Sequence, residues 1–117
     1  MNTIIVSAFT NEAASKAKGL LLKAKLDELI SSGEKDISID FSGITKFASP
    51  FFNNSLAALA LVYGFSAINS IQVKNISDVG FNTYQTSINN AKTVSDNQEH
   101  AVEINQIIDN APKKVSS

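Results

Sequence analysis

Ser49 is the residue that could take the largest number of chemical roles. It stands after a predicted strand and a short turn, at the start of a predicted apolar helix. A serine hydroxyl there could cap the helix, accept a phosphate or act as a nucleophile. A nucleophile needs a general base, and the one histidine, His100, stands in a polar segment near Glu99 and Glu103. We interpret His100 as a surface residue. A cap and a phosphorylation switch are therefore the two interpretations of Ser49 that we keep.

Other signs of an enzyme or of a bound cofactor are missing from the sequence. It contains no phosphate loop, dinucleotide fingerprint, histidine pair or nucleophile elbow. It also contains no cysteine, which excludes disulfides and thiolate chemistry. Asp40 alone makes no metal site, and we expect it to pair with Lys74 or to be solvated. The sequence predicts a non-catalytic protein without cofactor or metal.

The charge pattern bears on nucleic-acid binding, and the N-terminal and apolar segments bear on membrane insertion and export. All ten basic residues among the 117 are lysines, and the net charge is −1. Without arginine there is no planar fork for phosphate or guanine, and the lysines are dispersed, which disfavours nucleic acid. The first residues resemble a strand and not a signal peptide, and the apolar run 56–63 is too short to span a membrane. We expect a cytoplasmic protein with no membrane contact.

The elements that must position Ser49 follow from periodicity and from capping residues. Strands are predicted at 3–9, 37–41 and 71–75, because these segments are β-branched or alternate between apolar and polar residues. Four helices are predicted: from Thr10-Asn11-Glu12 to Gly33, from Ser49 to Gly64, from Ser77 or Asp78 past Ala91, and around 101–108 up to Asn110 and Pro112. The order β-α-β-α-β-α-α predicts a single α/β domain over 1–110, with a small parallel or mixed sheet and helices mainly on one face. A flexible tail is expected over 111–117.

The same periodicity predicts which side chains form the core. Ile37, Ile39 and Phe41 should share one face of their strand, opposite Ser38 and Asp40. The predicted stripe of the first helix is Ala13, Ala17, Leu20, Leu21 and Ala24, continuing to Leu29 and Ile30, and that of the third is Phe81, Tyr84, Ile88 and Ala91. Gly19, inside the first helix, suggests close packing on the sheet.

The second predicted helix is the unusual element. Ser49 and Pro50 suit its N-cap and first position, and Asn53, Asn54 and Ser55 suit a solvent-facing entrance. The following run, Leu56–Tyr63, is apolar all the way round. Such a helix is either flanked by other helices in the core or has an outer face that meets another protein.

A family resemblance rests on the stretch "ISIDFSGITKFASPFFNNSLAAL", preceded by a strand and a long helix and followed by "IQVKN". Over roughly 3–91 it resembles the STAS-like domains grouped with anti-sigma-factor antagonists, in particular a bacterial branch with the motif Asp-Phe-Ser-Gly-Val, here Asp40–Ile44. The resemblance implies a non-catalytic domain that binds a histidine-kinase-like ATPase, an anti-sigma-type kinase, and is controlled by phosphorylation of the serine that opens the helix. In the antagonist pattern Asp-Ser-Ser/Thr-Gly-Leu, Ala48 stands at the aspartate, Ser49 at the serine and Phe51 at the glycine, so only the serine is retained.

Three functions follow as hypotheses. The first is a regulatory protein-interaction module, with Ser49 as the phosphorylation candidate and with these candidate partner contacts: Thr45, Lys46, Phe51, Asn53 and Asn54. The second is a small-ligand or nucleotide-binding α/β domain that uses the loops 42–49 and 75–80 at the strand carboxyl ends. The third is a homodimer with a structural role, joined through the apolar second helix.

Overall fold

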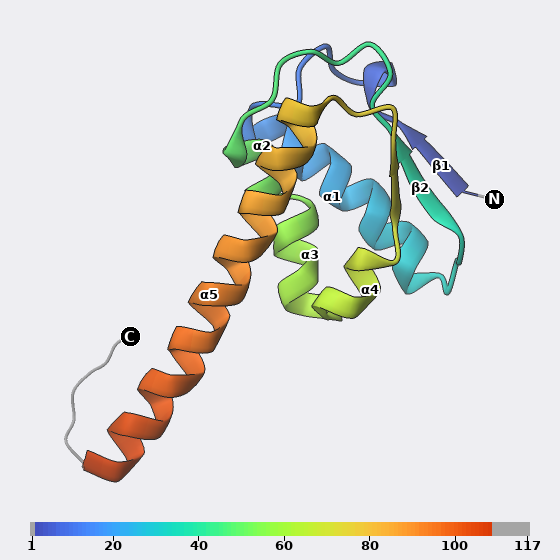
Figure 1. Cartoon of the computed structure of the whole chain (residues 1–117). Coiled ribbons are helices and arrows are strands. Elements are labelled where there is room, and N and C mark those ends of the chain that lie inside the picture. Colours follow the sequence, from blue (N-terminus) through green and yellow to red (C-terminus); the bar gives the residue numbers. More distant parts are fainter. Residues whose placement is uncertain (1, 109–117) are drawn as a thin grey trace.

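A computed structural model describes residues 2–108, with the surroundings of side chains described for 2–95. Three parallel strands form one sheet in the order β1-β2-β3. The helices lie on one side of it (Figure 1). The elements in chain order are β1 (Asn2–Ile5), a 3-10 turn η1 (Val6–Ala8), α1 (Lys16–Ser31), β2 (Ile37–Asp40), α2 (Ser49–Asn53), α3 (Leu56–Tyr63), α4 (Phe65–Asn69), β3 (Gln72–Lys74) and α5 (Asp78–Ile108). The predicted α/β domain with a small parallel sheet is confirmed.

The two faces of the sheet differ as the alternation predicts. Ile4, Ile39 and Val73 are paired across the three strands and lie on the helix-covered face. On the other face Thr3 lies beside Ser38, and their hydroxyl oxygens are 2.9 Å apart. Apolar residues therefore alternate with polar ones because only one face is covered.

The segment between β1 and α1 differs from the prediction. The first strand ends at Ile5, and α1 begins only at Lys16, with Ser15 as the N-cap whose side chain accepts from the Lys18 amide. The predicted cap at Thr10 forms a local turn instead, in which its hydroxyl accepts from the Glu12 amide. Ala13 then pairs with Phe47 in an isolated parallel bridge. The first turn of the predicted helix does not form, because Ala13 pairs with Phe47 in an extended conformation instead.

The core-facing side of α1 is also rotated from the predicted stripe. Gly19, Leu22 and Leu26 are buried, whereas Leu20 and Leu21 are 45% and 44% exposed. The cause is the close approach of α2, because a Cβ atom on Gly19 would lie 2.4 Å from the Phe51 carbonyl oxygen. Gly19 does mark close packing, but against α2 and not against the sheet.

The predicted second helix is broken into α2 and α3. Asn54 donates from Nδ2 to the Pro50 carbonyl oxygen at 2.7 Å, and Ser55 donates from its hydroxyl to the Phe51 carbonyl oxygen at 2.7 Å. Side chains of this kind compete with the backbone for the carbonyls of a helix. The predicted stop at Gly64 is confirmed, since it follows α3 with a positive φ of 102°.

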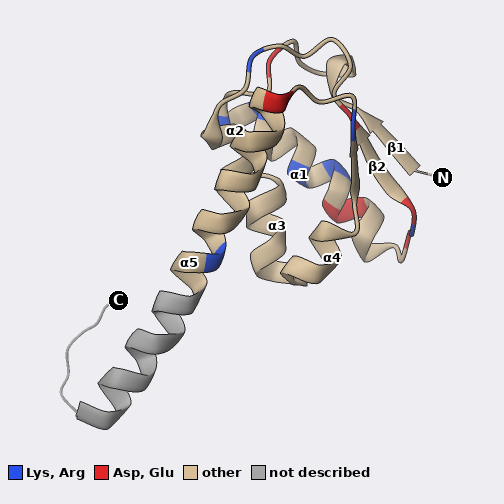
Figure 2. Ribbon diagram, in the orientation of Figure 1, with Lys and Arg blue, Asp and Glu red and all other residues tan. Residues whose placement is uncertain are grey.

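The apolar helix α3 is buried on one side and exposed on the other. Leu56, Ala57, Leu59 and Ala60 are buried in α3. Helix α3 lies among α1, α4 and α5, and α2, α3 and α4 carry no charged side chain (Figures 1 and 2). Leu61 and Val62 nevertheless stay 55% and 69% exposed, so α3 has an apolar outer face.

The third and fourth predicted helices are one continuous helix, α5, so the predicted separation into two helices is wrong. Ser77 is its cap, accepting from the Gly80 amide at 3.1 Å. Tyr84 and Ile88 are buried as predicted, but Phe81 is exposed, because Gly80 takes the position that faces Phe47. The side chains of His100, Ala101, Ile104, Ile107 and Ile108, as well as Asn110, Pro112 and the predicted tail 111–117, lie outside the described residues.

Candidate functional site

The turn 41–48 places Ser49 beyond the carboxyl end of β2, and two contacts fix its path. Ala13 donates its amide to the Lys46 carbonyl at 2.9 Å and accepts from the Ala48 amide at 3.0 Å. The Phe47 ring stacks on Phe52 with 6.3 Å between centroids. The chain that enters α2 is therefore held by the loop before α1 and by the aromatic core.

Asp40 fixes the beginning of the same turn. Its Oδ1 accepts from the amide and the hydroxyl of Ser42 at 2.8 and 2.7 Å, and from Asn75 Nδ2 at 3.0 Å. These hydrogen bonds, led by the Ser42 hydroxyl and Asn75, hold the pKa of the Asp40 carboxyl below its ordinary value of 3.8. Lys74 lies opposite Asp40 in strand register, but within the described residues the two form no ion pair, and the Lys74 charge is only a minor contributor to that pKa. The carboxylate therefore serves as an anchor for the turn.

Ser49 does not cap α2, contrary to the prediction. It is the first residue of the helix, while Ala48 takes the extended N-cap conformation (φ −148°, ψ 152°) with no side-chain cap hydrogen bond. The bridge to Ala13 keeps Ala48 extended, so the helix can begin only at the next residue. The Ser49 side chain is exposed, and its hydroxyl is not needed to begin the helix.

Five exposed residues form the surface around this hydroxyl, which we call the α2 entrance: Thr45, Lys46, Ser49, Pro50 and Asn53. Lys46 Nζ lies 3.6 Å from Glu12 Oε2, an exposed pair that contributes about 0–1 kcal/mol. The Asn53 amide oxygen accepts from the Ser87 hydroxyl and so ties α2 to α5. The α2 entrance is thus a mixed polar surface on a firmly held backbone.

Two of the predicted contact residues lie elsewhere. Phe51 is 0% exposed and packs edge-on against Phe52, with 5.3 Å between ring centroids. Asn54 is half-buried and its amide is engaged with the Pro50 carbonyl. Neither residue is therefore part of the α2 entrance. Pro50, which the sequence did not suggest as a contact, belongs to it, because the helical turn that buries Phe51 and Phe52 exposes Pro50.

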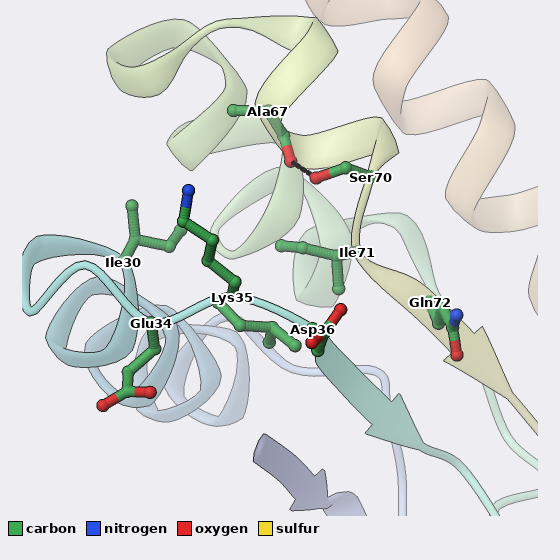
Figure 3. A pocket seen from close by; sticks show the side chains of 9 residues that line it. Ile30, Glu34, Lys35, Asp36, Ala67, Ser70, Ile71 and Gln72 are labelled. Atoms are coloured by element: carbon green, nitrogen blue, oxygen red, sulfur yellow. Dashed lines mark hydrogen bonds between the residues drawn. The ribbon is translucent and has the colours of Figure 1, made fainter. Parts of the chain in front are cut away.

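Two cavities lie on the described part of the chain, and neither involves the predicted ligand loops 42–49 and 75–80. One, of about 520 Å³, lies against 7–12, Ser15 and Lys18. The other, of about 420 Å³, lies at the amino-terminal ends of β2 and β3 (Figure 3). Within the described residues no cluster of three or more histidine, aspartate or glutamate side chains suits a metal, and no described helix is both long and apolar enough to cross a membrane.

Comparison with known proteins identifies the family. Residues 18–80 match the family described as "STAS-like domain of unknown function (DUF4325)". No curated protein and no solved structure matches the chain. The matched region runs from the start of α1 into α5 and includes the whole α2 entrance, and it is more than half of the 117 residues. The chain therefore belongs to the DUF4325 family of STAS-like domains.

Proposed function

We propose that this chain is a non-catalytic protein-interaction module that docks a protein partner on the α2 entrance and is regulated by phosphorylation of Ser49. The observation that carries the proposal is that the Ser49 hydroxyl is exposed and does not cap α2. A capping role would have explained the serine at this position without any regulatory function. Membership of the STAS-like family favours an interaction or regulatory module over an enzyme. The resemblance to anti-sigma-factor antagonists suggests a histidine-kinase-like ATPase as the partner, and a bacterial cytoplasm as the location.

The local packing explains how such a switch would work without unfolding the domain. Phe51 and Phe52 point into the core, whereas Ser49, Pro50 and Asn53 lie on the opposite side of α2. A phosphate on Ser49 would add about two negative charges to the surface at neutral pH. Because the core side chains lie on the other side of the helix, the added charge changes what can dock there and leaves the fold in place.

The test is a quantitative pull-down from native-host lysate with three baits: wild type, Ser49→Asp and Ser66→Asp. Ser66 is exposed on α4, so its replacement adds the same charge away from the α2 entrance. We expect an ATPase with the histidine-kinase-like fold to be recovered by wild type and Ser66→Asp and lost by Ser49→Asp. Equal recovery on all three baits would contradict a switch at Ser49.

The outer face of α3 supports a second candidate, a structural homodimer. Leu61 and Val62 are large, apolar and exposed on a helix that carries no charge. A permanent dimer through this face would persist on dilution in size-exclusion chromatography with light scattering. Val62→Lys would then produce a monomer and Ser66→Lys would not, whereas a wild-type monomer at every concentration would exclude this candidate.

A further inference from the structure

The cavity at the amino-terminal ends of β2 and β3 combines an apolar floor with two opposite charges (Figure 3). Ile30, Ile37 and Ile71 supply the apolar lining, and Lys35 and Asp36 supply the charges. In Figure 3 the Lys35 side chain extends beside Ile30, and the Asp36 carboxylate lies beside Ile71. Its volume of about 420 Å³ is within the range of small-molecule sites.

The two charges are not used inside the domain. In the part of the chain with described side chains, the one ion pair joins Lys46 to Glu12. The Lys35 backbone carbonyl accepts a hydrogen bond, but neither the Lys35 ammonium nor the Asp36 carboxylate makes one there. The neighbouring Glu34 is different, because its Oε1 accepts from Asn2 Nδ2 at 3.0 Å, and its side chain points away from the other lining residues in Figure 3. The Lys35 ammonium and the Asp36 carboxylate are therefore available to a ligand.

The loop that carries these charges is held in place by Asn2, at the start of β1. The Asn2 side chain donates from Nδ2 to the Lys35 carbonyl at 3.1 Å, and the Asn2 backbone N–H donates to the Asp36 carbonyl at 3.4 Å. Asp36 has a φ of 56°, in the left-handed region that few residues other than glycine, asparagine and aspartate adopt. A loop fixed in this way loses little freedom when a ligand binds, which favours affinity.

We propose that this cavity binds a small zwitterion with an apolar body, which is the chemistry of a free branched-chain amino acid. Asp36 accepts from the ligand ammonium, Lys35 donates to the ligand carboxylate, and the branched body covers Ile30, Ile37 and Ile71. Charge-assisted hydrogen bonds of this kind are the strong ones, particularly beside an apolar wall. The site lies at the end of the strands opposite the α2 entrance, so it is independent of the partner proposed there.

The test is a titration of the full chain with L-isoleucine, followed by amide chemical shifts in NMR spectra. We expect saturable shifts at 34–37 and 70–72, and none at the α2 entrance. N-acetyl-L-isoleucine, which lacks the ammonium, and L-isoleucine amide, which lacks the carboxylate, should each bind at least about tenfold more weakly.

Two variants assign the charges to their residues. Asp36→Asn keeps a residue that tolerates positive φ, and Lys35→Gln keeps a long polar side chain, so both should fold. Each should weaken L-isoleucine binding by about tenfold or more, while Lys74→Gln and Asp78→Asn, away from the cavity, should not change it. The proposal is wrong if no saturable shift occurs at 34–37 and 70–72 up to about 10 mM ligand, or if Asp36→Asn binds like wild type.

Discussion

At the scale of single residues, a serine near the start of a helix caps it only where the serine itself occupies the N-cap position. Ser15 and Ser77 each occupy an N-cap and accept from an amide three residues on. Ser49 also stands where a helix begins in the sequence, yet Ala48 occupies the cap. Local sequence could not show this difference, because it comes from a bridge to Ala13, 35 residues earlier in the chain.

The capping assignment predicts unequal costs for equal substitutions. Ser15→Ala should lower the free energy of unfolding by about 1 kcal/mol, because it removes the hydrogen bond to the Lys18 amide. Ser49→Ala should change it by less than about 0.5 kcal/mol. Urea denaturation of the two variants beside wild type measures the difference. A loss at Ser49 as large as that at Ser15 would mean that the hydroxyl does cap α2.

Asp40 predicts a pH dependence with a definite sign. Its pKa is lower in the folded chain than the ordinary 3.8, so its charged form stabilises the fold above pH 3.8, and this contribution is lost as the pH falls through the lower folded value. Asp40→Asn should therefore be less stable than wild type at pH 7, and the gap between them should close under acid. Thermal unfolding of both proteins from pH 7 to pH 2.5 tests this, and a gap that stayed constant or widened in acid would refute it.

At the scale of elements, patterns fixed by local periodicity were predictable, and features set by contacts between elements were not. The three strands, the face of β2 and the stop at Gly64 follow from alternation and from glycine alone. The rotation of α1 depends on how closely α2 approaches it. The break between α2 and α3 depends on which backbone carbonyls the side chains of Asn54 and Ser55 reach. For the site, the exposure of Thr45 and Lys46 agrees with their place in a polar turn. The cavity could not be foreseen, because its two sides, 34–37 and 70–72, are distant in the sequence.

The close contact of α1 with α2 predicts that replacing glycine by alanine, which usually stabilises a helix, destabilises the fold at Gly19. Alanine is normally favoured over glycine inside a helix by about 1 kcal/mol. Gly19→Ala should instead destabilise the domain by about 1–3 kcal/mol, because the new methyl group would meet the Phe51 carbonyl, a backbone atom that cannot move alone.

Ala17→Gly is the matched control for this prediction. Ala17 is exposed on the same helix, so replacing it with glycine should show the ordinary preference, a loss of about 1 kcal/mol. Urea denaturation of both variants decides the point. A stabilised Gly19→Ala would show that α1 and α2 do not approach as closely as described.

At the scale of the whole molecule, the parallel sheet separates two surfaces. The α2 entrance lies beyond the carboxyl end of β2, and the charged cavity lies where β2 and β3 begin. Leu61 and Val62 on α3 form a third, apolar surface, and neither residue belongs to the α2 entrance or lines the charged cavity. A partner, a small ligand and a second copy of the chain would therefore use different parts of the domain, and position-specific cross-linking can distinguish the first from the third.

The most direct test of the central claim is photo-cross-linking in the native host, with a photoreactive amino acid placed at Thr45, Val62 or Ser66. These positions report on the α2 entrance, the outer face of α3 and an exposed position on α4 that we expect to be inert. The account predicts a covalent adduct with one other protein from Thr45, and none from Val62 or Ser66. An adduct from Val62 with a second copy of this chain, and none from Thr45, would contradict it and favour the homodimer.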